Sequence, residues 1–189
     1  CRTCKRPISW RHPIIELLTG ILLVGYVARF GIIINFDWLF LLVAVFGFFL
    51  LGLFDFYYLI LPDKLVFPMI ALAFLRIFFY GNQSRLIDLG IGLLLMSFFA
   101  ILYLVSRGKW LGFGDVKLVL CIGILFGYPG AILILLFSVW IASLVGLLII
   151  ILKRGSLKTA LPFGSFLCFI SIIFILFREQ LSFIIQIFS

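Results

Sequence analysis

Two aspartates lie in otherwise strongly apolar sequence, and of all the residues in this chain they are the best suited to chemistry. Asp55 precedes the element Leu61-Pro62-Asp63, and Asp115 follows Gly112-Phe113-Gly114. An ionisable side chain within a hydrophobic segment is energetically costly and therefore usually marks a functional site. Two carboxylates that meet can share a proton and activate a water molecule, which is the chemistry of an aspartic protease.

The local sequence leaves alternatives open for each acid. For Asp55 the alternatives are a structural carboxylate paired with Lys or Arg and a substrate site in a transporter. Asp63 follows a proline and precedes a lysine, which favours a solvated loop. The glycines at 112 and 114 favour a functional role for Asp115, because glycine tolerates a positive φ and lets another backbone come close.

The composition is that of a membrane protein. Hydrophobic residues make up 66% of the 189-residue chain, Phe alone occurs 24 times, and the mean hydropathy is +1.38. A soluble domain of this size could not hide so much apolar surface. Apolar runs of roughly 18 or more residues indicate membrane-spanning helices. We therefore expect an all-α fold, a polytopic transmembrane helical bundle.

The apolar runs predict about seven spans. Asn35-Phe36-Asp37 is a helix-start signal for the second span, and Pro62 ends it. The fifth run is short: its helix would measure about 18 Å, against a hydrocarbon core of about 30 Å. It should therefore cross only part of the bilayer, or continue into a buried loop before it. The expected spans are 13–29, 38–61, 65–80, 86–105, 116–127, 131–152 and 164–177.

The formal net charge of +8 is best explained by membrane topology, because the basic residues cluster between apolar runs and cytoplasmic loops collect Lys and Arg. No basic run is interleaved with aromatics in a solvated groove, so nucleic acid is not an expected partner. A cytoplasmic N-terminus predicts that both aspartates lie toward the cytoplasmic face. It places Arg2, Lys5, Arg6, Arg11, Lys64, Arg107, Lys109, Lys117, Lys153, Arg154 and Lys158 inside, against Arg29, Arg76, Arg85 and Arg178 outside.

The chain begins with a cysteine pair rather than with Met, which indicates a fragment of a longer protein. Cys1 and Cys4 have the spacing of half a tetrahedral zinc site, whose other ligands would include His12 or an upstream pair. A reduced thiol pair without function is the alternative, and a redox motif is the third. We expect residues 1–12 to be the end of a cytoplasmic loop and residues 13–189 to form a transmembrane aspartic peptidase domain.

Taken in order, these motifs resemble the type IV prepilin peptidases, which are GxGD-type membrane aspartic proteases. The resemblance covers nearly the whole chain and rests on four elements besides Asp55. They are the cysteine pair with the following Pro13-Ile14-Ile15-Glu16-Leu17, Leu61-Pro62-Asp63, Gly112-Phe113-Gly114-Asp115-Val116-Lys117-Leu118, and Pro162-Phe163-Gly164.

The resemblance implies an activity and a site. It implies that Asp55 and Asp115 are catalytic, without saying which is acid and which is base. The motif residues implied to support substrate binding are Gly112, Gly114, Lys117, Asp63 and Glu16. The implied reaction is endopeptidase cleavage of the leader of type IV prepilins and pseudopilins. It would take place at the cytoplasmic face of a multi-pass protein of the bacterial inner membrane, and the peptidase would need no cofactor.

Many members of that family also methylate the new N-terminus using S-adenosylmethionine, and they carry two Cys-x-x-Cys pairs proposed to bind zinc. Only the second pair is present here, so zinc and S-adenosylmethionine are expected only in the full-length protein. Two other functional classes stay open. A proton- or cation-coupled transporter would use the buried carboxylates and show internal repeats, and a membrane scaffold would use the cysteine segment for docking.

Overall fold

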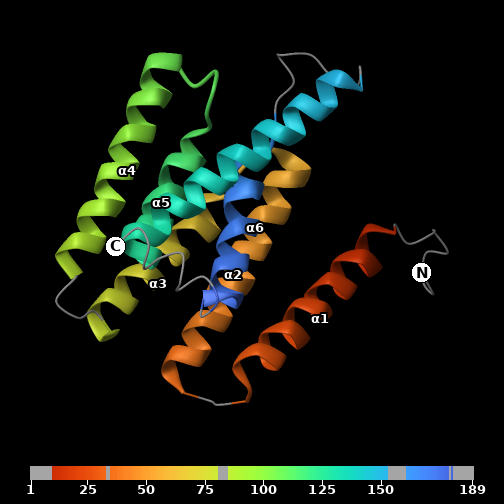
Figure 1. The fold of residues 1–189 in the computed structure, drawn as a ribbon, viewed down its shortest axis with the longest axis vertical. Helices are drawn as coiled ribbons and strands as arrows, with labels where there is room; N and C mark the ends of the chain where they lie inside the picture. Colours follow the sequence, from red (N-terminus) through yellow and green to blue (C-terminus); the bar gives the residue numbers. More distant parts are fainter. Residues whose placement is uncertain (1–9, 33–34, 81–84, 153–160, 179, 181–189) are drawn as a thin grey trace. The chain divides into compact units, whose positions relative to one another are not determined.

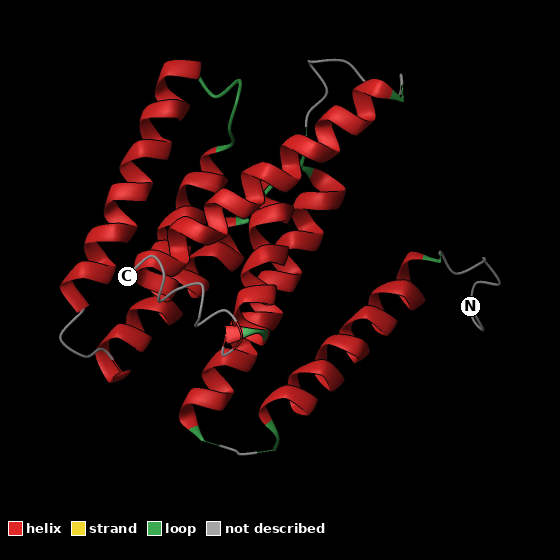
Figure 2. Cartoon of the chain, viewed as in Figure 1, coloured by secondary structure: helices red, strands yellow, loops and turns green. Residues whose placement is uncertain are grey.

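The described part of the chain is entirely helical. The computed structural model describes residues 10–32, 35–80, 85–152, 161–178 and 180, and these contain helices and loops but no strand (Figures 1 and 2). The expected all-α fold is confirmed. The helices are α1 (Arg11–Phe30), α2 (Phe36–Tyr58), α3 (Asp63–Tyr80), α4 (Arg85–Ser106), α5 (Phe113–Ile151) and α6 (Phe163–Leu176).

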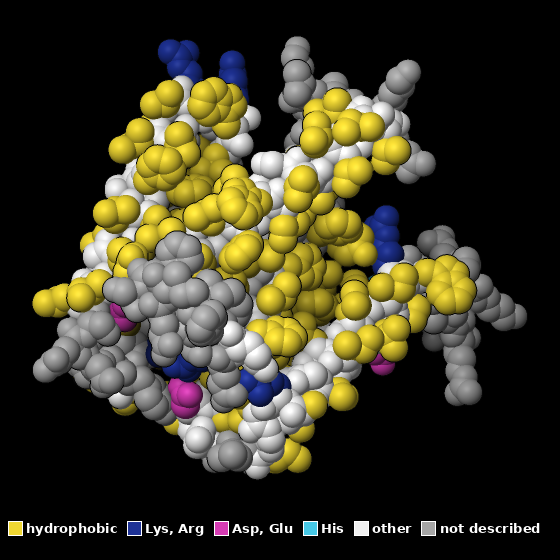
Figure 3. All heavy atoms as spheres, in the orientation of Figure 1, with side chains coloured by type: hydrophobic (Ala, Val, Ile, Leu, Met, Phe, Trp, Pro, Cys, Tyr) yellow, Lys and Arg dark blue, Asp and Glu magenta, His cyan; other side chains and the backbone are white. Residues whose placement is uncertain are grey.

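Four of the described helices are long and apolar enough to cross a membrane: α1, α2, α4 from Leu86, and α5. Many of their large apolar side chains are exposed, and hydrophobic side chains cover much of the visible helix surface in Figure 3. Such surfaces are stable in contact with lipid but not in contact with water. A helical membrane bundle is therefore confirmed. The number of seven spans stays a prediction, since α6, with 14 residues, is shorter than a usual span.

Helix α5 is broken in its middle, where Gly127 and Tyr128 have non-helical backbone angles just before Pro129. Proline has no N–H, so the carbonyl of Leu125 loses the helical donor it would otherwise have four residues on. The guanidinium of Arg76 in α3 donates a hydrogen bond to that carbonyl instead. The break lies where the sequence predicts the boundary between the runs 116–127 and 131–152.

Gly127 tests how strictly the break depends on glycine. Its φ is +60° and its ψ is −163°, a region that other residues occupy only at a cost of roughly 1–3 kcal/mol. A Cβ at this position would also overlap the carboxylate of Asp88. We expect Gly127→Ala to lower the thermal unfolding midpoint in detergent. Gly130→Ala is the matched control, because its Cβ would lie 3.4 Å from that of Phe126 in ordinary contact; equal midpoints for the two variants would contradict the argument.

The chain divides into two compact units, residues 1–42 and 43–189. In the first unit, the buried Tyr26 of α1 donates a 2.6 Å hydrogen bond to the carbonyl of Trp38 at the start of α2. The side chain of Asn35 accepts a 2.7 Å hydrogen bond from the Trp38 N–H, so the predicted helix-start signal is confirmed. The predicted domain boundary between residues 12 and 13 stays a prediction.

In the second unit, α5 packs against α3, α4 and α6 (Figure 1). Small residues allow the closest approach, as is usual between membrane helices. A Cβ at Gly92 of α4 would lie 2.8 Å from Cγ1 of Ile124 of α5, and one at Gly52 of α2 would lie 3.1 Å from Cβ of Cys168 of α6. Close packing of α2 on α6 and of α6 on α5 brings the two aspartate-bearing helices together. Cys121 and Cys168 are buried free thiols.

Candidate active site

Asp55 and Asp115 come together in the interior of the second unit. Asp55 lies in the last turns of α2 and Asp115 in the first turn of α5, and their exposed fractions are only 6% and 8%. Gly164 of α6 lies between them: a Cβ built there would be 3.1 Å from Cγ of Asp55 and 2.9 Å from Oδ1 of Asp115. These two atoms are therefore at most about 6 Å apart. Burial of two carboxylates so close together is the arrangement that favours a shared proton.

Asp55 is held by the N-terminus of α6. Its Oδ2 accepts a 2.6 Å hydrogen bond from the backbone N–H of Ser165, and the Ser165 hydroxyl lies 3.1 Å from the same oxygen. The hydroxyl also lies 2.9 Å from the carbonyl oxygen of Gly52, one turn before Asp55. The first N–H groups of a helix have no partner within the helix and attract negative charge. A carboxylate is thus fixed in place by a segment distant in sequence.

Asp115 has fewer hydrogen-bond donors around it than Asp55 among the described residues. Its Oδ2 accepts a 3.2 Å hydrogen bond from the N–H of Gly112, which immediately precedes α5. Its Oδ1 is buried and has no hydrogen-bond partner among the described residues. A buried oxygen without a partner is rare and calls for an explanation. This oxygen lies beside Gly164, as the carboxylate of Asp55 does, so it is well placed to bind a water or a substrate group.

The structure shows what surrounds the two glycines before Asp115, and their part in substrate binding stays a prediction. Gly112 has φ −75° and ψ 147°, which any residue can adopt, so its tolerance of positive φ is not used. At Gly114 the group that packs closely is the Leu61 side chain rather than another backbone, because a Cβ at Gly114 would lie 2.7 Å from Cβ of Leu61. The Leu61-Pro62-Asp63 element therefore packs directly on the first turn of α5. Open space for a substrate backbone at Gly114 was the expectation, and Leu61 occupies it.

The comparisons with known proteins identify the family of this chain. Residues 42–151 match the model of the type IV leader peptidase family, and residues 1–30 match that of the bacterial peptidase A24 N-terminal domain. The chain belongs to the type IV leader peptidase family.

Similar curated proteins are named prepilin leader peptidase/N-methyltransferase. Those of Pseudomonas aeruginosa and Stutzerimonas stutzeri are 32% and 31% identical to this leader peptidase family member over 96% of its length. The protein of Legionella pneumophila is 31% identical over 89%. The chain covers 63%, 64% and 59% of these three relatives, so it spans less than two thirds of their length. No solved structure matches it.

A second contact in this leader peptidase family member joins two further charged motif residues, Lys117 and Asp63. Lys117 of α5 forms a 2.6 Å ion pair with Asp63 at the start of α3. The ammonium also lies 5.0 Å from the ring centre of Phe67 and 4.8 Å from that of Phe113. The Lys117 side chain is 14% exposed and that of Asp63 is 57% exposed. Asp63 is thus a surface residue, as its sequence context predicts, that ties α3 to α5.

We expect Asp63→Asn to leave substantial peptidase activity. An ion pair with one partner this exposed contributes little to stability, so activity should stay within roughly fivefold of the wild type. The amide oxygen can still accept a hydrogen bond from Lys117. The measurement is the initial rate of leader cleavage at matched protein concentration. A loss as deep as that caused by changing Asp115 would mean that Asp63 takes part in the reaction.

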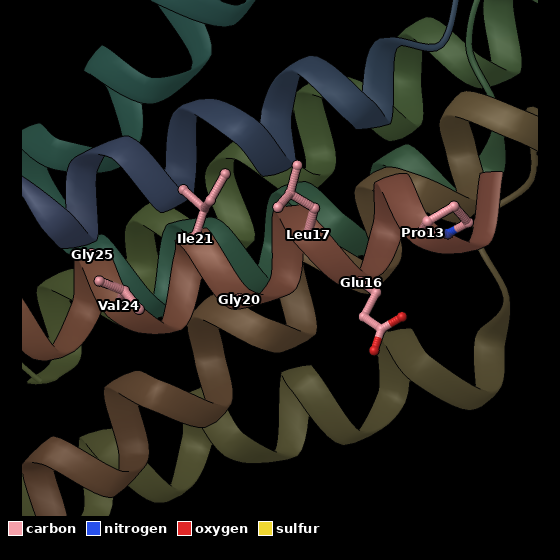
Figure 4. A pocket seen from close by; sticks show the side chains of 7 residues that line it. All are labelled: Pro13, Glu16, Leu17, Gly20, Ile21, Val24 and Gly25. Atoms are coloured by element: carbon pink, nitrogen blue, oxygen red, sulfur yellow. The ribbon is translucent and has the colours of Figure 1, made fainter. Parts of the chain in front are cut away.

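The remaining candidates, Glu16, Cys1 and Cys4, stay predictions. Glu16 lies in α1, in the first unit, so its part in substrate binding stays a prediction. It lines a pocket along α1 together with Gly20 and Gly25 (Figure 4), and in that view its carboxylate points away from the side of the helix that carries Leu17 and Ile21. Cys1 and Cys4 lie outside the described residues. Within the described ranges, no group of three or more His, Cys, Asp or Glu side chains could hold a metal.

Sequence reasoning missed Ser165, and it did not assign Gly164 a place between the carboxylates. In the sequence, Pro162-Phe163-Gly164 stands out only as one element of the family resemblance. The available signal was a serine in the first turn of a helix otherwise composed of apolar residues. A buried polar side chain in such a helix needs a polar partner, but the sequence does not say that the partner is Asp55.

Proposed function

We propose that this chain is a membrane aspartic endopeptidase that cleaves the leader peptide of type IV prepilins and pseudopilins. The observation that carries the proposal is the meeting of Asp55 and Asp115 at Gly164, with Oδ1 of Asp115 buried and without a partner among the described residues. Membership of the type IV leader peptidase family and the names of the relatives support the substrate class.

In the proposed reaction the two carboxylates hold a water molecule between them and share one proton. The ionised carboxylate takes a proton from this water as it attacks the scissile carbonyl carbon. The protonated carboxyl gives its proton to the carbonyl oxygen, and the leaving amine is protonated as the C–N bond breaks. The pair acts as one coupled unit, so the two roles belong to the dyad. Burial strengthens the electrostatic interactions within it.

We propose that the reaction takes place at the cytoplasmic face of the bacterial inner membrane. The support is the distribution of Lys and Arg between the loops, which favours a cytoplasmic N-terminus. The C-terminal end of α2 and the N-terminal end of α5, which carry the aspartates, would then face the cytoplasm. A prepilin leader would reach the dyad from that side.

The proposed orientation predicts opposite labelling of two loops. In a variant without native cysteines, Lys109→Cys, at an exposed position, should react with a membrane-impermeant thiol reagent only from the cytoplasmic side. A cysteine at position 82 should react only from the opposite side. The measurement is labelling in intact cells and in inverted membrane vesicles, and labelling of both positions from one side would contradict the orientation.

Methylation of the new N-terminus is proposed only for a longer protein. The relatives' names include N-methyltransferase, but this chain covers less than two thirds of their length. Zinc bound by Cys1 and Cys4 with further ligands would belong to that longer protein too. Metal analysis should then find about one zinc per chain, lost when both cysteines are changed to Ser.

The peptidase proposal is tested with the purified chain in detergent. A type IV prepilin is added, and the product is examined by mass spectrometry for loss of the leader. The prepilin leader peptidase/N-methyltransferase of Pseudomonas aeruginosa is the positive control, and mature pilin is the control for cleavage elsewhere. Removal of the leader at a single bond supports the proposal. A folded chain that leaves intact a prepilin cleaved by the positive control contradicts it.

A further inference from the structure

The structure assigns Ser165 to the reaction as a positioning residue, whose hydroxyl supports Asp55 in both of its protonation states. This inference rests on the proposed peptidase function and identifies a further residue of the same site. Ser165 is 2% exposed and lies in the first turn of α6, directly after Gly164. Its backbone N–H and its hydroxyl both lie within hydrogen-bond distance of one oxygen of Asp55.

The hydroxyl has two possible acceptors and one proton. Its oxygen lies 3.1 Å from Oδ2 of Asp55 and 2.9 Å from the carbonyl oxygen of Gly52. A hydroxyl carries a single donor hydrogen but can also accept. It can therefore donate to one of these oxygens at a time, and rotation about its Cβ–Oγ bond changes which one.

A hydroxyl that can change its acceptor suits Asp55, because a general acid and base must be stable both with and without its proton. When Asp55 is ionised, the hydroxyl can donate to its Oδ2, next to the bond from the Ser165 N–H. When Oδ2 carries a proton, that O–H can donate to the Ser165 oxygen, and the Ser165 hydrogen turns to the Gly52 carbonyl. Each state then keeps its buried polar atoms paired, and an unpaired one would be costly. The backbone N–H cannot do this, because it only donates.

The same helix provides a matched comparison. Ser171 is also fully buried in α6, and its hydroxyl donates a 2.8 Å hydrogen bond to the carbonyl of Leu167 in the same helix. Within the part of the chain that the structure describes, this hydroxyl makes no hydrogen bond to either aspartate. Removing its hydroxyl changes the volume and polarity of the α6 core as removing that of Ser165 does, but it leaves Asp55 untouched.

The test compares three variants with the wild-type chain: Ser165→Ala, Ser165→Cys and Ser171→Ala. Cleavage kinetics on a prepilin and thermal unfolding are measured under reducing conditions. We expect Ser165→Ala to lower kcat by roughly tenfold, which corresponds to one hydrogen bond to a charged group. KM should stay unchanged, and the unfolding midpoint should fall no further than that of Ser171→Ala, which also loses a buried hydroxyl. Cys fills the space but hydrogen-bonds weakly, so Ser165→Cys should resemble Ser165→Ala. Ser171→Ala should keep the wild-type kcat.

Each other outcome would overturn the assignment. A kcat within twofold of wild type for Ser165→Ala would mean that the hydroxyl is not needed. Recovery of kcat by Ser165→Cys, an equal loss in Ser171→Ala, or failure of Ser165→Ala to fold would each indicate a packing role. Absence of cleavage by the wild-type chain would instead contradict the proposed function, so the two failures are distinguishable.

Discussion

Asn at either Asp55 or Asp115 is expected to abolish leader cleavage. The two carboxylates meet at Gly164, and neither alone can both accept a proton from water and donate one to the peptide. Loss of general acid–base catalysis costs roughly 100- to 10,000-fold in rate. The measurement is the initial rate of prepilin shortening by Asp55→Asn and Asp115→Asn at matched protein levels. The double variant should be no slower than either single one, because groups that act as a unit are not additive.

Both Asn variants should fold, which makes the result interpretable. The amide oxygen of Asn can still accept from the N–H of Ser165 at position 55 or from that of Gly112 at position 115. Removing one of two neighbouring buried carboxylates also removes a repulsion rather than leaving a charge without its partner. Equal unfolding midpoints for wild type and variants are the control. Efficient cleavage by either folded variant would show that the dyad is wrongly assigned.

Gly164→Ala is expected to remove nearly all activity by inserting a single methyl group between the carboxylates. The new Cβ would lie 2.9 Å from Oδ1 of Asp115 and 3.1 Å from Cγ of Asp55. Real contacts of this kind are longer, so the carboxylates or α6 must move, and a shift of about 1 Å at a reacting group costs about 100-fold in rate. The expected result is a deep loss of kcat in a chain that still binds its substrate.

The control for this substitution is Gly90→Ala in α4, where the structure leaves nothing within 4 Å of the new Cβ. It makes the same change of residue in a helix and should keep full activity. Cleavage rates and unfolding midpoints of Gly164→Ala and Gly90→Ala are measured together. The comparison separates an effect at the dyad from a general effect of placing alanine in a helix. Wild-type activity in Gly164→Ala would mean that the dyad does not depend on the close approach of α6.

The features of this fold that depend on neighbouring residues in the sequence could be predicted from the sequence. Asn35 was recognised as a helix start because its side chain can accept from an N–H three residues on, as it does from Trp38. The break in α5 was visible because Pro129 cannot donate to the carbonyl of Leu125. Asp55 and Asp115 stood out because charges are rare in apolar segments. Their assignment as catalytic stays a prediction until variants are assayed.

The features that depend on tertiary packing could not be predicted. The donors to Asp55 come from Ser165, which is separated from it by 110 residues, and no local pattern encodes that pairing. Leu61 fills the space beside Gly114, whereas the two glycines suggested room for a substrate. The number of membrane crossings also stayed open, because apolarity alone does not decide whether a 14-residue helix such as α6 crosses the bilayer or ends within it.

The dependence of Asp55 on α6 has a consequence for the order of synthesis. A ribosome completes both aspartates by residue 115, but the most C-terminal of the described helices, which carries Gly164 and Ser165, is translated only afterwards. A nascent chain that ends between α5 and α6 therefore contains both acids, yet Asp55 still lacks its donors from Ser165. If the chain is the proposed peptidase, cleavage would therefore begin only after α6 has been made and has packed on α2, even though both aspartates are present earlier.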